Sequence, residues 1–329
     1  MKVLHIIARF NVGGTASWLS TLSRELIDAG NSSIIVTGNV KFPEIESVKL
    51  DALPHIRIAE LGQTLSLSDD IQSFIKLRRL IAEINPDIVN THTAKAGVLG
   101  RLAALSLGKS RPTIVHTIHE HLLTGYFGKL KVRLVVLVES ILARYSDFLL
   151  FAGMKVQEDC IQAGIGTYKK SLVVMPGVEV PRESANSIAS TEVFSRARRI
   201  RVGCLARVTA VKRPDRVIEI AQKLPEIEFL IGGGGELFKN LSKIAPRNCH
   251  FLGWVEPKEF WQLMDIALLT SDNEALSEKI TILASNGYLR RKFGKNAKAR
   301  ATKLFSRKRQ LADHLKAYGI ALEFRNAAR

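Results

Sequence analysis

Cysteine is scarce in this chain. The 329 residues include three cysteines, Cys160, Cys204 and Cys249. They are scattered, without the spacing of zinc ligands or of a disulfide framework. We therefore interpret them as reduced core residues of a cytosolic protein. Clusters of His, Asp and Glu with ligand spacing are also missing, so the sequence predicts no metal site.

Long apolar runs without charge are missing as well. The most apolar stretch, residues 132–151, is interrupted by Arg133, Glu139, Arg144 and Asp147. Such a stretch is typical of a buried or surface helix and not of a membrane span, for which about 20 apolar residues are needed. The chain opens directly on a predicted strand, so we expect no signal peptide and a cytoplasmic location.

Acidic residues are outnumbered, with 31 Asp and Glu against 48 Lys and Arg, for a net charge of +17. A field of this sign attracts polyanions. Aromatic residues make up 7% of the chain and are not interleaved with the basic ones, and no nucleic-acid-binding motif is present. We therefore expect no nucleic-acid partner. An anionic membrane surface and a merely solvated basic surface both remain open.

Apolar residues are plentiful, at 46%, which is enough for two cores of ordinary size. Residues 1–180 alternate short apolar strands with helical patterns, as expected for a doubly wound α/β domain. The predicted strands cover residues 3–7, 33–37, 87–90, 113–117, 148–151 and 172–175, and helices are predicted at 16–28 and 71–84. A linker without apolar periodicity, residues 181–199, leads to a second domain of this type at 200–305, and a terminal helix, 306–329, carries Leu311 and Leu315 four residues apart.

The second domain contains a basic loop between a predicted strand, residues 200–205, and a helix that opens at residues 212–215. Arg207 and Lys212 lie in this loop, where open parallel sheets bind ligands. A guanidinium and an ammonium near a helix N-terminus suit two adjacent phosphates. The alternative is that both are solvated loop cations.

Three further segments of the second domain follow predicted strands. The glycine run 232–235, which includes Gly233, lies where backbone must turn sharply or approach a ligand, but lacks the acidic residue of a dinucleotide signature. Residues 250–255 are predicted to form a short strand and a turn, in which Trp254 and Val255 give either an apolar wall for a base or a core strand end. Glu274 places a carboxylate after a predicted strand at 265–270.

In the first domain, polar and glycine residues follow three predicted strands. Gly13 and Gly14 join a strand to a helix, where backbone amides can meet a phosphate or a sugar. His119 follows strand 113–117 at its C-terminal end. His92 and Lys95 follow strand 87–90 and either bind an acceptor or order the loop. A lone histidine in such a place is more often a structural hydrogen-bonding residue.

Taken in order, these segments resemble the retaining GT-B glycosyltransferases of family 4, especially those that build bacterial surface polysaccharides. The resemblance rests on the Gly13-Gly14 loop, residues 91–97 (THTAKAG), 99–104 (LGRLAA), 116–121 (HTIHEH) with Gly125-Tyr126-Phe127, Met175-Pro176-Gly177-Val178, and the Arg207/Lys212 loop. It implies a GT-B architecture, in which two Rossmann-like doubly wound domains face a cleft, with a C-terminal helix that returns to the first domain.

The resemblance also implies an activity and residue roles. The reaction is transfer of a hexose from a nucleoside diphosphate sugar, with a UDP-sugar favoured, to a lipid-linked or saccharide acceptor with retention, without a cofactor. Arg207, Lys212 and Gly14 would bind the diphosphate, where cations stabilise the charge of the leaving group. His119 and Glu274 are the candidate catalytic residues. Gly13, Gly233, Trp254 and Val255 would contact the nucleoside or sugar, and His92 and Lys95 the acceptor.

The chain departs from the family after Glu274. Family members continue there with a second glutamate eight positions on, followed by a strand and a glycine-rich loop. Here residues 275–280 (ALSEKI) follow at once and resemble a later helix, so roughly forty residues, the size of a helix, strand and loop unit, are missing. The second domain is therefore predicted to be shortened, with about four strands against at least six in the first.

Two functions of different classes follow from this departure. The first is an active glycosyltransferase, peripheral at the inner face of the cytoplasmic membrane. The second is a catalytically silent remnant that binds an acceptor or a partner.

Overall fold

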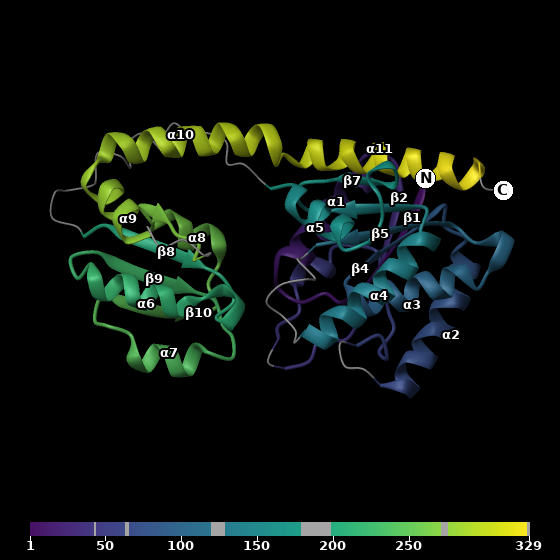
Figure 1. Ribbon diagram of the computed structural model, residues 1–329, viewed down its shortest axis with the longest axis horizontal. Helices are drawn as coiled ribbons and strands as arrows, with labels where there is room; N and C mark the ends of the chain where they lie inside the picture. The colour runs from purple at the N-terminus through teal and green to yellow at the C-terminus, as the bar shows by residue number, and fades with distance from the viewer. Residues whose placement is uncertain (43, 63–65, 120–128, 179–198, 271–275, 328–329) are drawn as a thin grey trace. The chain divides into compact units, whose positions relative to one another are not determined.

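We describe the fold from a computed structural model of the chain. The description covers residues 1–42, 44–62, 66–119, 129–178, 199–270 and 276–327. The chain divides into two compact units, Met1–Val180 with Ala301–Arg329, and Pro181–Arg300. We call them unit 1 and unit 2 and describe each by itself (Figure 1).

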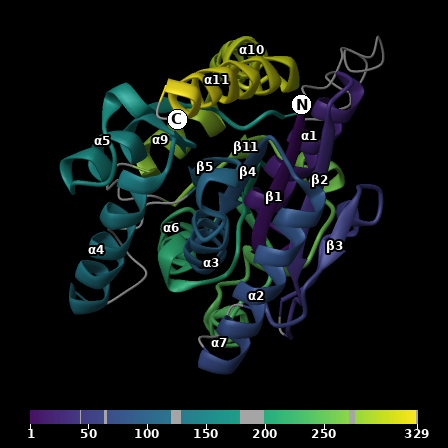
Figure 2. The same cartoon turned by 90° about the vertical axis from the view of Figure 1, so that its right-hand side faces the viewer.

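Unit 1 is built on a parallel sheet of seven strands. They are β1 (Lys2–Arg9), β2 (Ser32–Gly38), β3 (His55–Arg57), β4 (Ile88–His92), β5 (Thr113–Ile118), β6 (Phe148–Phe151) and β7 (Ser171–Val173). Their order, β3-β2-β1-β4-β5-β6-β7, is that of a doubly wound sheet, with a reversal of winding between β1 and β4. Figure 2 shows β3 at the edge of the sheet beside β2. The six predicted strands are present with small shifts, and the prediction missed β3.

Helices cover both faces of this sheet. They are α1 (Gly14–Asp28), α2 (Leu67–Ile84), α3 (Ala94–Leu105), α4 (Lys129–Tyr145), α5 (Met154–Gln162) and α11 (Arg307–Ala327). The alternation of β1 shows why two layers form. Val3 and Ile7 belong to the core shared with α1 and α11, whereas Leu4 and Ile6 belong to the core shared with α2 and α3, because successive side chains of a strand point to opposite faces.

Local sequence signals set the ends of α2. The Ser66 hydroxyl accepts a hydrogen bond from the amide of Asp69, and Asp69 and Asp70 place negative charge in the first turn. Asn85 ends the helix in a left-handed conformation, with φ of 47°. A capping hydroxyl, early carboxylates and a terminal Asn are the expected signals for helix ends.

The C-terminal helix α11 packs on the sheet of unit 1. Its buried residues include Ala317, Tyr318 and Ala321, which join the core on the α1 side. Tyr318 Oη accepts a hydrogen bond of 2.8 Å from Asn90 Nδ2 on β4. Residues 175–178 adjoin its start, where the amide of Val178 donates to the carbonyl of Phe305 at 2.7 Å.

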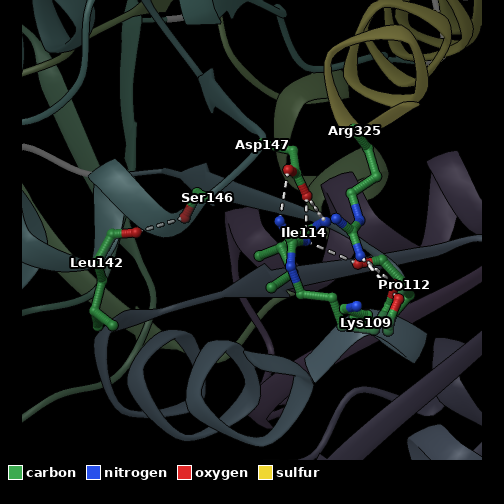
Figure 3. A network of polar contacts seen from close by, with 8 residues as sticks. Lys109, Pro112, Ile114, Leu142, Ser146, Asp147 and Arg325 are labelled. Atoms are coloured by element: carbon green, nitrogen blue, oxygen red, sulfur yellow. Dashed lines mark hydrogen bonds and ion pairs between the residues drawn. The ribbon is translucent and has the colours of Figure 1, made fainter. Parts of the chain in front are cut away.

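A network of polar contacts fixes the other end of α11 (Figure 3). Arg325 donates to the backbone carbonyl oxygens of Lys109 and Arg111, at 3.2 and 3.4 Å. Arg111 in turn forms a bidentate pair with Asp147, at 2.6 and 2.9 Å. The same carboxylate accepts the amide of Ile114 at 2.8 Å. The helix therefore is held by polar contacts to loops as well as by apolar packing.

Unit 2 is built on a parallel sheet of four described strands, in the order β10-β9-β8-β11. They are β8 (Arg201–Leu205), β9 (Glu228–Gly232), β10 (Cys249–Gly253) and β11 (Ile266–Ala267). The helices are α6 (Pro214–Lys223), α7 (Phe238–Ile244), α8 (Pro257–Gln262), α9 (Leu276–Ser285) and α10 (Gly287–Leu304), the last of which extends past the end of unit 2 at Arg300.

One strand of unit 2 is shorter than the sequence predicts. The strand and turn predicted over 250–255 agree with the structure, because β10 ends at Gly253 and Trp254 and Val255 follow it. The strand predicted over 265–270 forms a ladder only at Ile266 and Ala267. Among the described residues β11 is an edge strand, and Leu269 beyond it is 73% exposed. The described sheet thus holds the first four strands of a doubly wound order, which agrees with a shortened second domain.

The three cysteines are buried and unpaired. Burial raises the pKa of the Cys160 and Cys249 thiols to about 12. They are core residues, as the sequence predicts.

Candidate functional site

Two loops of unit 1 leave the sheet at the point where the winding reverses. β1 and β4 are neighbours, yet the chain continues from β1 towards β2 and from β4 towards β5. Ligands of doubly wound sheets bind outside the carboxyl ends of the strands at such a point. The loops after β1 and β4 carry Gly13, Gly14 and Thr93, and the loop after the next strand, β5, carries His119.

Gly13 and Gly14 have space around them. A Cβ on Gly14 would meet no atom within 4 Å, and one on Gly13 would meet only the Asn11 carbonyl, at 4.0 Å. Internal packing therefore does not require glycine at either position. Gly13 caps the fifteen-residue helix α1 without a side-chain hydrogen bond, and no acidic residue lies in its first turn. Amides at this helix N-terminus are suited to an anion or a sugar hydroxyl.

Thr93 adds backbone strain on the other side of the same point. Its φ is 64° and its ψ is 158°, a region in which a β-branched residue is an outlier. Three non-glycine residues in the described ranges have positive φ, and two of them, Thr93 and Arg213, lie in loops where a sheet reverses its winding. Strain of this kind concentrates at functional sites.

Four histidines and a tryptophan form a cluster behind these loops. His5 Nδ1 lies 3.1 Å from His92 Nε2, and His92 Nδ1 lies 2.9 Å from His119 Nε2. The Trp18 ring of α1 packs edge-to-face against His119, with ring centroids 4.5 Å apart, and against His314 of α11, at 4.7 Å. We call His5, His92, His119, His314 and Trp18 the histidine cluster. The row of imidazoles runs from fully buried His5 to half-buried His119.

Burial keeps these imidazoles neutral. It lowers the pKa of His5 and of His119 to about 3, and repulsion from His314 adds to the effect at both. Burial also lowers the pKa of His314 to about 4. The pKa of His92 lies well below its usual value, first because of burial and then because of the neighbouring histidines. At neutral pH the cluster therefore offers hydrogen bonds but no positive charge.

Neutrality fixes how the protons are arranged. A neutral imidazole carries one N–H, so His92 donates to one neighbour and accepts from the other. His5 Nε2 is buried without a partner among the described atoms, and an unpaired N–H is rarer in protein interiors than an unpaired acceptor. His5 Nδ1 therefore donates to His92, and His92 Nδ1 donates to His119 Nε2. His119 then carries its own proton on Nδ1, as a hydrogen-bond donor.

His92 and Lys95 do not lie as an acceptor site requires. The His92 side chain is fully buried, and both of its ring nitrogens face other histidines. Lys95 pairs with Asp70 of α2 at 2.6 Å and is largely covered. These contacts favour the second of the readings that the sequence left open, in which the two residues order the loop between β4 and α3.

Unit 2 has its own point of reversed winding, between β8 and β11. The loop after β8, residues 206–213, carries Arg207 and Lys212 and leads to Pro214 at the first position of α6. The hydroxyl of Thr270, after β11, donates to the carbonyl of Lys212 at 2.5 Å. This bond holds the loop against the carboxyl end of β11. We call residues 206–213 the cationic loop.

Two cations of the cationic loop have no side-chain partner in the described part of the chain. Lys212 is exposed and Arg207 half-buried, and neither side chain forms a hydrogen bond or ion pair there. Arg213, in contrast, forms a bidentate pair with Asp215 at 2.7 to 3.1 Å, and this contact lowers the pKa of the Asp215 carboxyl. The loop therefore presents two uncommitted positive charges beside a helix N-terminus, an arrangement suited to two phosphates.

The glycine run after β9 serves internal packing. A Cβ on Gly233 would lie 2.1 Å from the Ala206 carbonyl oxygen, and Gly233 has a φ of 126°. A Cβ on Gly234 would lie 2.6 Å from the Trp254 indole nitrogen. The amide of Val208 donates to the carbonyl of Gly234 at 2.9 Å. The run thus holds the cationic loop in place, while Trp254 remains exposed and Val255 half-buried.

Other predicted features lie outside this geometry. Glu274 lies outside the described residues, as do His121 and Gly125-Tyr126-Phe127. Within the described ranges, no group of three or more His, Cys, Asp or Glu side chains is arranged to hold a metal ion.

The comparison with a family model decides the family. The model described as Glycosyltransferase Family 4 matches residues 12–180, just over half of the chain and most of unit 1. The chain belongs to glycosyltransferase family 4. This confirms the resemblance stated from the motifs.

Curated members of the family share limited identity with this glycosyltransferase family 4 chain. It is 28% identical over 206 residues to the UDP-Gal:alpha-D-GlcNAc-diphosphoundecaprenol alpha-1,3-galactosyltransferase of Escherichia coli, covering 58% of the chain and 51% of that enzyme. It is 23% identical over 275 residues to the O-antigen biosynthesis glycosyltransferase WbnH of Escherichia coli, covering 82% and 75%. The chain thus spans about half the length of the first relative.

Solved structures establish the fold. Anabaena Alr3699/HepE, in complex with UDP and glucose, has a TM-score of 0.76 at 16% identity over 97% of this chain and 99% of that one. The lipopolysaccharide outer core galactosyltransferase WaaB, in its apo form, has a TM-score of 0.58 at 16% identity over 86% and 77%. The family 4 chain has the GT-B fold that the sequence predicts.

Sequence reasoning missed several residues of the cluster in this family 4 chain. His5 sits within a predicted strand, Trp18 within a predicted helix and His314 in the terminal helix, and no local pattern distinguishes them from core residues. The strain at Thr93 has no sequence signal either. A signal was available only for His92 and His119, which follow predicted strands.

Proposed function

We propose that this protein is a hexosyltransferase that moves a sugar from a nucleoside diphosphate sugar to an acceptor hydroxyl with retention. We favour a UDP-sugar as donor and a lipid-linked saccharide as acceptor, in surface polysaccharide biosynthesis at the inner face of the cytoplasmic membrane. Family membership supports the reaction class. The functions of the two Escherichia coli relatives support the donor, the lipid-linked acceptor and the pathway class.

One observation carries the proposal. Arg207 and Lys212 have no side-chain partners in the described part of the chain, and they lie beside a helix start where a doubly wound sheet reverses its winding. Uncommitted cations in a loop held by Thr270 and by the glycine run are suited to a diphosphate. If the two cations were only solvated surface residues, neither the Thr270 hydrogen bond nor the glycine run would be needed to hold their loop.

The chemistry follows from where charge builds up in the reaction. As the bond between the anomeric carbon and the diphosphate breaks, negative charge grows on the leaving oxygen. Arg207 and Lys212 would stabilise that charge without rearrangement, which is the largest catalytic term in many enzymes. The amides of Gly13 and Gly14 would approach the donor through the space that a Cβ would otherwise fill.

His119 would act as a neutral hydrogen-bond donor to the sugar or to the leaving oxygen. Its Nδ1–H is fixed by the His5 and His92 imidazoles behind it, so no proton rearrangement is needed when the ligand binds. Glu274 is the second proposed catalytic residue, by resemblance alone. Retaining transfer of this kind does not require the paired carboxylates of retaining glycosidases.

Calorimetric titration with UDP and with GDP tests the phosphate site. We expect binding of one of them, with UDP favoured, and a loss of at least tenfold in affinity in Arg207→Ala and in Lys212→Ala, equivalent to about 1.4 kcal/mol. Arg247→Ala is the matched control, because Arg247 is exposed and precedes β10, at the opposite edge of the same sheet. Equal binding by all four proteins would refute the assignment of the two cations.

A second function has a specific observation in its favour. The described sheet of unit 2 ends at β11, with Leu269 exposed, and the family's second glutamate is missing from the sequence. A silent family member that binds an acceptor or a partner would show this pattern. It would give no turnover of any nucleotide sugar while still binding a glycan or lipid-linked saccharide, so detected turnover would exclude it.

A further inference from the structure

The outer face of α4 carries an unusual row of apolar side chains. Leu130, Leu134 and Leu137 are 82%, 60% and 57% exposed. Ile141 and Tyr145 are also exposed and continue the row. The intervals of four, three, four and four residues place all five on one side of the helix. Single exposed leucines are ordinary, but a contiguous row of this length marks an interaction surface.

The opposite face of α4 is firmly attached to unit 1. Leu142 and Ala143 are buried. Glu139 is buried and receives two hydrogen bonds from buried Arg101 of α3, at 2.8 and 2.9 Å. A paired buried charge holds the helix in one orientation. The row is therefore exposed because of how the helix is anchored, and α4 lies beside α3 at the side of the unit (Figure 1).

The exposed charges of α4 itself have one sign. Lys131, Arg133 and Arg144 are exposed on this helix. By helical geometry Arg133 and Arg144 flank the row on one side and Lys131 on the other. The helix has one acidic residue, Glu139, and it is directed into the interior. Among the described residues of α4 itself, the outer face thus combines apolar side chains with cations, and the one carboxylate of the helix is directed away from it.

These features together indicate a lipid surface. A helix that lies in the plane of a membrane buries an apolar face and places Lys and Arg beside it, against anionic headgroups. Nucleic acid fits this face less well, because the centre of the face is apolar whereas the phosphates of nucleic acid are bound by cations. In the described chain, no helix combines the length and the apolar character needed to cross a membrane.

We propose that the face of α4 formed by Leu130, Leu134, Leu137, Ile141 and Tyr145 docks the protein onto an anionic lipid bilayer. The apolar side chains insert among the upper acyl chains, and Arg133 and Arg144 pair with lipid phosphates. The docking would bring unit 1 to the surface where a lipid-linked acceptor resides. It does not depend on the sugar-transfer activity, and its test involves no turnover.

Co-sedimentation of the full chain with sucrose-loaded vesicles tests the proposal. The vesicles contain phosphatidylcholine alone or phosphatidylcholine with 25 mol% phosphatidylglycerol. We expect binding to the anionic vesicles only, and a loss of about tenfold or more in partition coefficient in Leu134→Ser/Leu137→Ser, since burial of a leucine stabilises by more than 1.4 kcal/mol. The matched control is Leu67→Ser/Ile71→Ser, which removes two exposed apolar residues of α2.

A second pair of variants tests the cations. Arg133→Gln/Arg144→Gln should weaken binding severalfold, since each cation near an anionic surface contributes about 1 kcal/mol, whereas Arg78→Gln/Arg79→Gln, on exposed positions of α2, should change it much less. Unfolding midpoints of all variants are compared with the parent. No binding of the parent protein to anionic vesicles would overturn the proposal. Equal loss of binding in the α2 and α4 variants would also overturn it. So would a dimer in size-exclusion chromatography that depends on the α4 row.

Discussion

At the scale of single residues, the histidine cluster links the C-terminal helix to the loop that carries His119. His314 Nδ1 of α11 donates to the carbonyl of Gln310 at 2.7 Å, and the ring packs against Trp18. As the acceptor here is a carbonyl oxygen, His314 Nδ1 must be the donor, so its Nε2 is the unprotonated nitrogen in the neutral ring. The position of His119 thus depends on neutral neighbours drawn from β1, β4, α1 and α11.

This arrangement predicts a dependence of stability on pH. The folded-state pKa values of His5, His119 and His314, about 3, 3 and 4, lie below the unfolded value near 6.5. As pH falls below 6.5 the unfolded chain binds protons that the folded chain does not, so stability decreases with falling pH. Each such histidine lowers the free energy of unfolding by about 1.4 kcal/mol between pH 7.5 and pH 5.5. We expect the free energy of unfolding of unit 1 to decrease by at least ~2 kcal/mol in total.

Urea unfolding monitored by tryptophan fluorescence measures this loss. The chain has three tryptophans, so Trp254→Phe/Trp261→Phe leaves Trp18 as a reporter in unit 1. Trp18→Phe leaves the reporters of unit 2, whose one histidine in sequence, His250, is exposed. An unchanged unit 1 midpoint between pH 7.5 and 5.5, or an equal decrease in unit 2, would contradict the account.

Two glycines of the site are predicted to respond differently to alanine. Gly233→Ala should destabilise unit 2 by about 2 kcal/mol or more, since its Cβ would meet the Ala206 carbonyl at 2.1 Å with φ at 126°. Gly14→Ala should leave unit 1 as stable or up to about 1 kcal/mol more stable, because it opens α1 with free space beside it. Urea midpoints of the two variants measure both effects. Equal destabilisation would show that Gly14 also serves packing.

The sequence reached part of the site and not the rest, for a physical reason. His119, Gly13 and Arg207 follow strands, and the rule that ligands bind at the carboxyl ends of parallel strands identifies such positions. The rule cannot say which of them the tertiary fold buries. His92 follows a strand as His119 does, yet it lies between two other histidines. Whether a polar side chain faces a ligand or a neighbour depends on contacts distant in sequence.

At the scale of elements, α11 buries polar side chains together with apolar ones. Of the two leucines that mark this helix in the sequence, Leu311 is partly buried against the core and Leu315 is exposed. The buried positions include Gln310, His314 and Arg325. Gln310 donates to the carbonyl of Trp18 at 3.2 Å. Periodicity of apolar residues alone could not identify this face, because its burial depends on polar partners elsewhere in unit 1.

One contact of α11 gives a direct test of that packing. Tyr318→Phe removes the acceptor of the Asn90 amide, which lies in a fully buried site. A buried donor left unpaired costs about 1 to 3 kcal/mol. We expect a loss of this size in the urea unfolding of unit 1, reported by Trp18. Tyr168→Phe, at an exposed tyrosine, is the control, and an equal, negligible effect of both would show that the bond contributes nothing.

The sequence predicts the presence of strands better than it predicts their lengths. The apolar runs of unit 1 mark six strands because a parallel strand is buried on both faces. β3 escaped prediction because it has three residues, with charged or polar residues at both ends. In unit 2 an apolar run continues through Leu268 and Leu269 after β11 has ended. A run of apolar residues indicates burial. Whether the run also pairs as a strand along its whole length depends on whether a neighbouring strand exists.

At the scale of the whole molecule, the two units carry different parts of the proposed chemistry. Unit 1, most of which matches the family model, carries the histidine cluster and the open glycine loop. Unit 2 carries the cationic loop on a sheet with four described strands. The small size of this sheet could be anticipated from the sequence, because the apolar runs that predict strands can be counted.

Sugar transfer by this chain is tested by a measurement of turnover. The measurement is release of UDP from UDP-galactose, UDP-glucose and UDP-N-acetylglucosamine, with a lipid diphosphate-linked N-acetylglucosamine as acceptor. We predict acceptor-dependent release from at least one donor, an α-configured product by NMR, and a decrease of about a hundredfold or more in Arg207→Ala, as for loss of one stabilising group, but not in Arg247→Ala. No release from any donor by a protein that unfolds cooperatively would contradict the account and favour the silent family member.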